Sequence, residues 1–220
     1  MRRTARIAGA FYMLNLAFGP AFYAIRKYVV TGDAAATAAN IASHETLFRL
    51  GFAGNTIAIV SYVVVTALFF ELFKPVNRTV SLVAAFLGLM GCAVLAVGDV
   101  FFLAPLPASA ARQQSPALGL MFIRLYSQSF YVSIVFFAFY CAVIGYLVFR
   151  STFLPRILGV GMSLAGLSWL TFLWPPLVDY LSWYRFPLAI GEAALALWLL
   201  IAGVNSERWK EQAAASRLEN

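Results

Sequence analysis

The sequence predicts an all-α integral membrane protein, a bundle of six transmembrane helices with both termini in the cytoplasm. Of its 220 residues, 62% are hydrophobic and only 11% are charged, and the mean hydropathy is +0.82. Such a composition lies outside the range of soluble domains. Six long apolar stretches, joined by short connections, use nearly all of the chain. We therefore expect one transmembrane domain over residues 1–205 and a short charged cytoplasmic tail over residues 206–220.

The length of each apolar stretch identifies the spans. A bilayer core about 30 Å thick is crossed by roughly 20 helical residues. Hydropathy and flanking polar residues place the spans at Ala8–Ile25, Phe52–Phe73, Val80–Pro105, Leu118–Phe149, Ile157–Trp174 and Pro187–Val204. The fourth is longer than a simple crossing requires, so we expect Leu118–Gln128 to lie at the interface or beyond it.

The first span has two interpretations. Arginines precede its apolar run, as in a secretory signal peptide. Its apolar core is longer than that of a typical signal, and the small residues Asp33–Ala39 follow only after a polar turn. We therefore expect a helix that is retained in the membrane.

The segment Arg26–Gly51 predicts a short external helix between spans one and two. Asp33 can cap free amides, and the alanine-rich run Ala34–Ser43 has high helix propensity. Such a helix leads His44, Glu45 and Arg49 to the mouth of the second span. These three residues either form a lid over a cavity in the bundle or belong to a simple surface connector.

The distribution of Lys and Arg predicts the orientation. One side receives ten cations, namely Arg2, Arg3, Arg6, Lys74, Arg78, Arg150, Arg156, Arg208, Lys210 and Arg217. The other receives six, namely Arg26, Lys27, Arg49, Arg112, Arg124 and Arg185. The excess of cations marks the first side as cytoplasmic, in the cell membrane.

Spans two and three resemble spans four and five. Leu47–Leu50 and Phe122–Leu125 each place an arginine before a long span that ends at a basic turn. A parallel duplication is one way in which transporters build a site between similar halves. Helical hairpins with interfacial arginines also resemble each other by chance, so both interpretations stay open.

The strongest chemical signal is a set of polar residues inside the spans. If alternate spans run in opposite directions, the outer half of the bundle holds Asn55, Asp99, Arg124, Gln128 and Glu192. An ionisable group costs roughly 2.5–3.5 kcal/mol at a helix centre on insertion scales, so Asp99 and Glu192 should face the interior, with Arg124 as their partner. This set fits a polar layer that aligns the helices, a ligand-binding cavity open to the outside, or a site in which two carboxyl groups perform acid–base chemistry.

Other classes of function lack the residues that they require. His44 is the only histidine and no cysteine cluster accompanies it, so we expect no metal and no cofactor. A serine nucleophile would lack an intramembrane histidine to activate it. The cations lie at span ends rather than in a basic patch, which disfavours nucleic acid as a partner. The expected partners are the lipid bilayer and a small or lipophilic ligand.

Several stretches along the chain resemble the DUF4386 family. They are Gly32–Ile41, Glu45–Gly51, Leu72–Arg78, Phe153–Val160, and Gly191-Glu192 leading through Ala196–Leu200 to Gly203–Asn205. The resemblance implies a bacterial or archaeal multi-pass membrane protein and no particular activity. The chain departs from the family pattern at Leu125–Phe130, where relatives carry His and Asp.

Together these observations predict an outward-facing polar chamber that binds or passes a small or lipophilic molecule. The alternatives are an intramembrane enzyme that uses Asp99 and Glu192 as acids on a lipid-soluble substrate, and a structural accessory subunit.

Overall fold

The computed structural model describes residues 1–18, 27–30, 32–105, 116–180 and 182–218, and within these every regular element is a helix. The long helices are α1 (Arg2–Phe18), α4 (Glu45–Phe73), α5 (Arg78–Leu103), α7 (Pro116–Arg150), α8 (Arg156–Trp169) and α10 (Ser182–Ile201). The shorter elements are α3 (Ala34–Ser43), the 3₁₀ helix η1 (Leu170–Leu173), α9 (Pro175–Tyr180) and α11 (Ser206–Leu218).

Four of these segments are long and apolar enough to cross a membrane: Glu45–Phe73, Arg78–Leu103, Pro116–Arg150 and Arg156–Leu173. They match predicted spans two to five. A fifth crossing would need the pair Ile190–Ile201 and Ser206–Ser216, which is bent by 104°. The predicted first span extends into residues 19–26, outside the described residues. The chain is thus a membrane-type helical bundle, and its first and sixth spans stay predictions.

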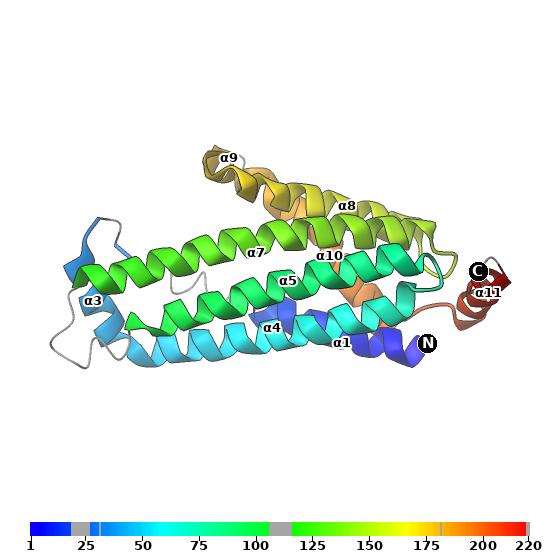
Figure 1. The fold of residues 1–220 in the computed structure, drawn as a ribbon, viewed down its shortest axis with the longest axis horizontal. Coiled ribbons are helices and arrows are strands. Elements are labelled where there is room, and N and C mark those ends of the chain that lie inside the picture. Colours follow the sequence, from blue (N-terminus) through cyan, green and yellow to red (C-terminus); the bar gives the residue numbers. More distant parts are fainter. Residues whose placement is uncertain (19–26, 31, 106–115, 181, 219–220) are drawn as a thin grey trace.

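The six long helices form a ring in chain order. Each packs against the one before it, from α1 to α4, α5, α7, α8 and α10, and α10 returns to pack against α1. Figure 1 shows the long axes running side by side, with both chain termini at one end. We call this the terminal end; α3 lies at the opposite end, which we call the α3 end. Aromatic side chains fill the ring, among them the fully buried Tyr12, Tyr126, Tyr140, Phe48 and Phe69.

Small residues bring the backbones of neighbouring helices together. A Cβ atom added to Gly191 of α10 would lie 2.1 Å from the carbonyl oxygen of Gly161 on α8. A Cβ atom added to Gly159 of α8 would lie 2.6 Å from the carbonyl oxygen of Gly145 on α7. Contacts this close leave no room for any side chain, so these glycines set the spacing of α7, α8 and α10.

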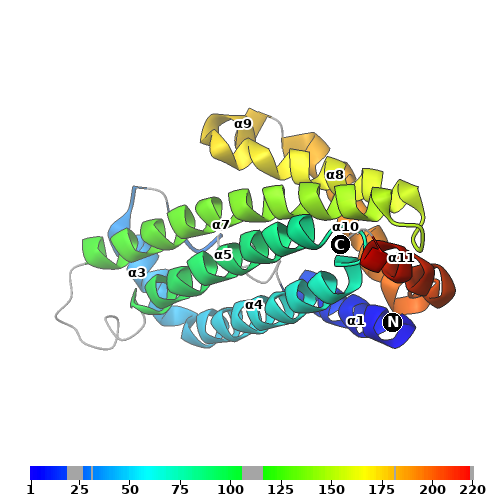
Figure 2. The same ribbon diagram turned by 45° about the vertical axis from the view of Figure 1, so that its right-hand side comes forward.

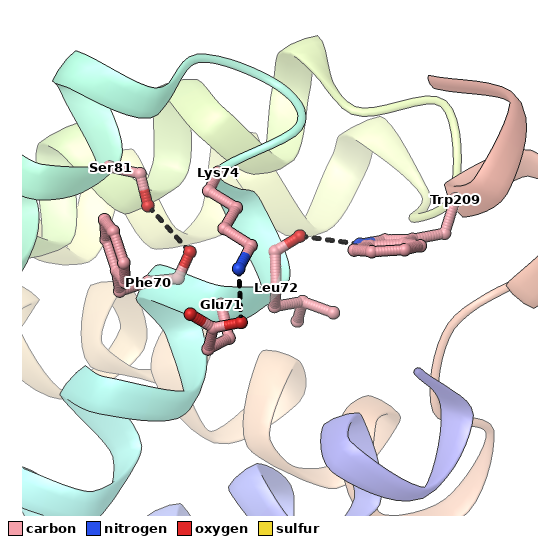
Figure 3. A network of polar contacts seen from close by, with 6 residues as sticks. All are labelled: Phe70, Glu71, Leu72, Lys74, Ser81 and Trp209. Carbon is pink, nitrogen blue, oxygen red and sulfur yellow. Dashed lines mark hydrogen bonds and ion pairs between the residues drawn. The ribbon is translucent and has the colours of Figure 1, made fainter. Parts of the chain in front are cut away.

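The terminal end is held by hydrogen bonds between distant parts of the chain. The guanidinium groups of Arg2 and Arg6 donate to the carbonyl oxygens of Ala202 and Ile201 at the end of α10. At the end of α4, the carbonyl oxygens of Phe70 and Leu72 accept from Ser81 Oγ and Trp209 Nε1, at 3.2 and 2.8 Å (Figure 3). Figure 2 shows α11 lying across this end. The tail is therefore helical over Ser206–Leu218, and it is docked on the bundle by Trp209.

The predicted external helix is present as α3. Asp33 is its N-cap and accepts a hydrogen bond from the amide of Ala36 at 2.8 Å. The first turns of the predicted fourth span belong to α7, a single helix of 35 residues that runs to the level of α3 and packs against it. At about 1.5 Å per residue, α7 exceeds the thickness of a bilayer core, which agrees with the expected projection of its start.

The contact between α8 and α10 yields a prediction. We expect Gly191→Ala to destabilise the bundle by about 1–3 kcal/mol, because its methyl group would overlap the backbone of Gly161. Gly119→Ala on α7 is the matched control, since among the described residues its added Cβ atom would meet only Pro105 Cβ, at 3.8 Å. Thermal unfolding of both variants in one detergent is the measurement. Equal melting temperatures would contradict the assigned role of the α8–α10 contact.

Candidate functional site

A buried carboxyl group lies near the α3 end of the ring. Asp99 of α5 is 4% exposed. Its Oδ1 accepts from Asn55 Nδ2 at 2.6 Å, and its Oδ2 accepts from Thr56 Oγ1 at 3.3 Å. The same amide nitrogen of Asn55 lies 3.4 Å from Tyr126 Oη on α7. These four residues, which we call the Asp99 cluster, join α4, α5 and α7 through neutral hydrogen-bonding groups.

Close packing and aromatic rings enclose the Asp99 cluster. Gly98 fits against Ser129 of α7, where an added Cβ atom would lie 2.9 Å from Ser129 Cβ. Towards the α3 end, Phe48 stacks on Phe102 with ring centroids 5.7 Å apart. Phe102 in turn lies 5.1 Å from the ring of Tyr126. Phe48 and Phe102 lie on the α3 side of Asp99 along α4 and α5, and with Tyr126 they pack over the buried carboxyl group.

A second buried carboxyl group lies halfway along the bundle. Glu192 of α10 is 8% exposed. Its Oε2 accepts from Tyr12 Oη at 3.0 Å, and its Oε1 accepts from Trp169 Nε1 and from Cys141 Sγ, the latter at 3.6 Å. We call Tyr12, Cys141, Trp169 and Glu192 the Glu192 cluster. Its members come from α1, α7, α8 and α10, and three donors converge on one carboxyl group.

The glycine contact places Glu192 among these donors. Gly191 touches the backbone of Gly161, so the next residue on α10 enters the space between α1, α7 and α8. Tyr12 is held in place by Tyr62 and Phe69, whose ring centroids lie 5.7 and 5.9 Å from its own. The Glu192 cluster is therefore a preorganised part of the helix contacts.

The two clusters are well separated along the bundle. Tyr126 and Cys141 both belong to α7, and the 15 residues between their positions correspond to about 22 Å of helix. The polar set expected from the sequence therefore divides into two sites at different depths. Asp99 and Glu192 are too far apart to act together on one substrate atom.

Arg124 and Gln128 lie outside both clusters. Both are exposed on α7, and the ion pairs within the described residues are Arg49–Glu45 and Lys74–Glu71. The expected pairing of Arg124 with the carboxyl groups is thus absent there. The reason is helix geometry: Arg124 is two residues from the buried Tyr126, which turns it about 200° around α7. Gln128 follows Arg124 by one turn and shares its exposed face.

The three expected lid residues contact their own neighbours. The His44 ring stacks on Tyr28 with centroids 4.1 Å apart, and its Nδ1 lies 3.0 Å from the carbonyl oxygen of Asn40. Glu45 and Arg49 form an exposed ion pair one turn apart. These contacts fix α3 to the start of α4, and none of them reaches Asp99.

Two hydroxyl groups face each other in the interior. Thr66 Oγ1 and Tyr140 Oη find no hydrogen-bond partner among the other described side chains. Tyr140 packs on Tyr62, which also packs on Tyr12 of the Glu192 cluster. An ordered water molecule or a ligand hydroxyl group would be stabilised at these atoms.

The described residues contain no group of three or more His, Cys, Asp or Glu side chains arranged to hold a metal ion. The chemistry that the site offers is hydrogen bonding and charge at two separate carboxyl groups. Their partners Tyr12 and Thr56, and Tyr126 beside Asn55, were missed in the sequence, although a tyrosine inside an apolar span signals a need for a polar partner.

The division into two clusters can be tested by double-mutant cycles. We expect Asn55→Ala and Asp99→Asn to couple by about 0.5–3 kcal/mol in thermal stability, because their side chains share a short hydrogen bond. Arg124→Leu with Asp99→Asn should be additive within about 0.5 kcal/mol, as for distant sites. Strong coupling in the Arg124 cycle would restore the single charged cluster expected from the sequence.

No curated protein and no solved structure matches this chain significantly. The family model described as a domain of unknown function, DUF4386, matches residues 7–203, which include both clusters, most of α1 and the whole of the other five long helices. The chain therefore belongs to the DUF4386 family.

Proposed function

We propose that this protein is a multi-pass protein of the cytoplasmic membrane that binds or passes a small or lipophilic molecule at the Asp99 cluster. The observation that supports this is the chemistry of Asp99. Its carboxyl group is buried among neutral donors, and the described residues provide no cation that pairs with it. An ionisable group inside a membrane bundle is costly to keep, and such groups mark ligand or ion pathways.

The surroundings of Asp99 suggest how a ligand would reach it. The stacked rings of Phe48 and Phe102 lie between the Asp99 cluster and the α3 end, and Phe102 also packs on the Tyr126 ring. Phe48 lies at the start of α4, next to the α3 segment that carries His44. A shift of α3 and Phe48 would open a path lined by aromatic rings, which favour lipophilic or cationic groups. In this proposal α3 acts as the lid.

The orientation belongs to the same proposal. The cations counted on the more basic side, from Arg2 to Lys210, gather at the terminal end, where the helix ends and the termini meet. By the positive-inside rule the terminal end is cytoplasmic. The α3 end and the Asp99 cluster then face outwards.

A structural role is the second candidate, and the Glu192 cluster favours it. Three donors from three different helices satisfy one carboxyl group of α10. Such a contact fixes the register of four helices without any ligand. The catalytic alternative is weaker, because a pair of carboxyl groups that act together must lie closer than the two clusters do.

A molecule that co-purifies with the protein would test the proposed binding role of Asp99. We expect mass spectrometry of the purified protein to detect a co-purifying small or lipophilic molecule that is reduced at least tenfold in Asp99→Asn. Glu45→Gln is the control, because it removes an exposed carboxylate at the same end. Identical bound material in all three proteins, with unchanged melting temperatures, would refute a binding role for Asp99.

Water access provides an independent check. In a variant without Cys92 and Cys141, a cysteine at position 56 should react with a membrane-impermeant thiol reagent applied outside intact cells. A cysteine at position 141, inside the Glu192 cluster, should stay unreacted. Labelling only in inverted vesicles would reverse the orientation, and no labelling at position 56 in either preparation would rule out an open chamber.

A further inference from the structure

A groove on the outer surface of the bundle lies between α7 and α8 near the terminal end. It encloses about 300 Å³ and is lined by Tyr146, Phe149, Gly159, Val160, Ser163 and Leu164. Four of these side chains are 40–48% exposed. Both helices are long and apolar enough to cross a membrane, so their exposed faces meet lipid.

The floor of the groove is backbone. Gly159 lies so close to α7 that an added Cβ atom would be 2.6 Å from both the carbonyl oxygen of Gly145 and the amide nitrogen of Phe149. Large side chains of α7 and α8 rise on either side of this contact. The helices cannot approach further, and the floor has no side chains. The groove can therefore be filled only by another molecule.

Two arginines lie at the end of the groove. The guanidinium carbon of Arg156 is 5.8 Å from the ring centroid of Phe149, which lines the groove. Arg150 follows Phe149 directly at the end of α7. Both arginines are exposed, and neither belongs to an ion pair within the part of the chain that the structure describes. A strip of apolar surface thus ends at two unpaired positive charges.

The dimensions match one leaflet of a bilayer. Val160 and Leu164 lie about one and two turns beyond Arg156, at depths of about 6 and 12 Å along α8. Half of a hydrocarbon core is about 15 Å thick. If the arginines lie at the level of the lipid headgroups, the groove runs along the path of an acyl chain.

We propose that this groove binds one anionic phospholipid, with an acyl chain along Val160 and Leu164 and the headgroup phosphate on Arg150 and Arg156. Basic sites between transmembrane helices bind acidic lipid headgroups in this way. The site is independent of the Asp99 cluster and of the proposed chamber, since it lies on the opposite end of the molecule and on its outer surface.

Lipid retention provides the test. The purified protein in detergent is titrated with an equal mixture of phosphatidylglycerol and phosphatidylcholine, and native mass spectrometry counts the lipids bound. We expect one phosphatidylglycerol to be retained preferentially. The double variant Arg150→Gln with Arg156→Gln should weaken its binding by about fivefold for each arginine removed. Arg78→Gln is the matched control, an exposed arginine of the terminal end on α5, away from the groove.

A second variant tests the apolar part. Val160→Trp should fill the groove and lower the retention of both lipids, and Leu164→Trp serves the same purpose if Val160→Trp unfolds. Unchanged preference for phosphatidylglycerol in the double arginine variant would overturn the proposal. So would a result in which Val160→Trp leaves lipid binding intact but converts a dimer into a monomer, because the groove would then be a contact between two copies of the chain.

Discussion

The architecture depends on the direct backbone contact between α8 and α10 at Gly161 and Gly191. In a bilayer, lipid is as apolar as a leucine side chain, so helices gain little by merely hiding apolar surface from it. Association therefore relies on close packing and on polar groups that find partners. The glycine contact provides the close packing. It also directs the next residue, Glu192, between three other helices, where its carboxyl group finds hydrogen-bond donors.

The two carboxyl groups of the interior differ in how completely they are satisfied. Glu192 accepts from a phenol, an indole and a thiol on three helices, a set that leaves little for a ligand to add. Asp99 accepts from one amide and from a hydroxyl at the longer distance of 3.3 Å. With two donors instead of three, Asp99 has more to gain from an additional partner. The two buried carboxyl groups thus differ in their hydrogen bonding, and the proposed binding role falls on the one with fewer donors.

The sequence predicted where the helical segments lie, but it did not predict which face of each helix points into the bundle. Spans two to five follow from hydropathy alone, and the cap at Asp33 follows from one residue and the alanines after it. Asp99 and Asn55 were correctly expected to be buried together. Arg124 was not, because hydropathy averages over all faces of a helix and cannot show which side Arg124 occupies. The sequence placed the start of the sixth span at Pro187, whereas α10 begins at Ser182, so Glu192 lies near the middle of that helix.

The ring of helices has a consequence for biosynthesis. Each helix packs on its predecessor, so most contacts can form as the chain emerges and enters the membrane. The contact between α1 and α10 is different, because the two helices lie at opposite ends of the chain. Until α10 is inserted, Tyr12, Cys141 and Trp169 have no acceptor at Glu192, and the N-terminal arginines have no carbonyl groups of α10 to bind. A chain that ends before Glu192 therefore cannot close the ring, and its Cys141 and Trp169 side chains lack the acceptor that they share in the finished bundle.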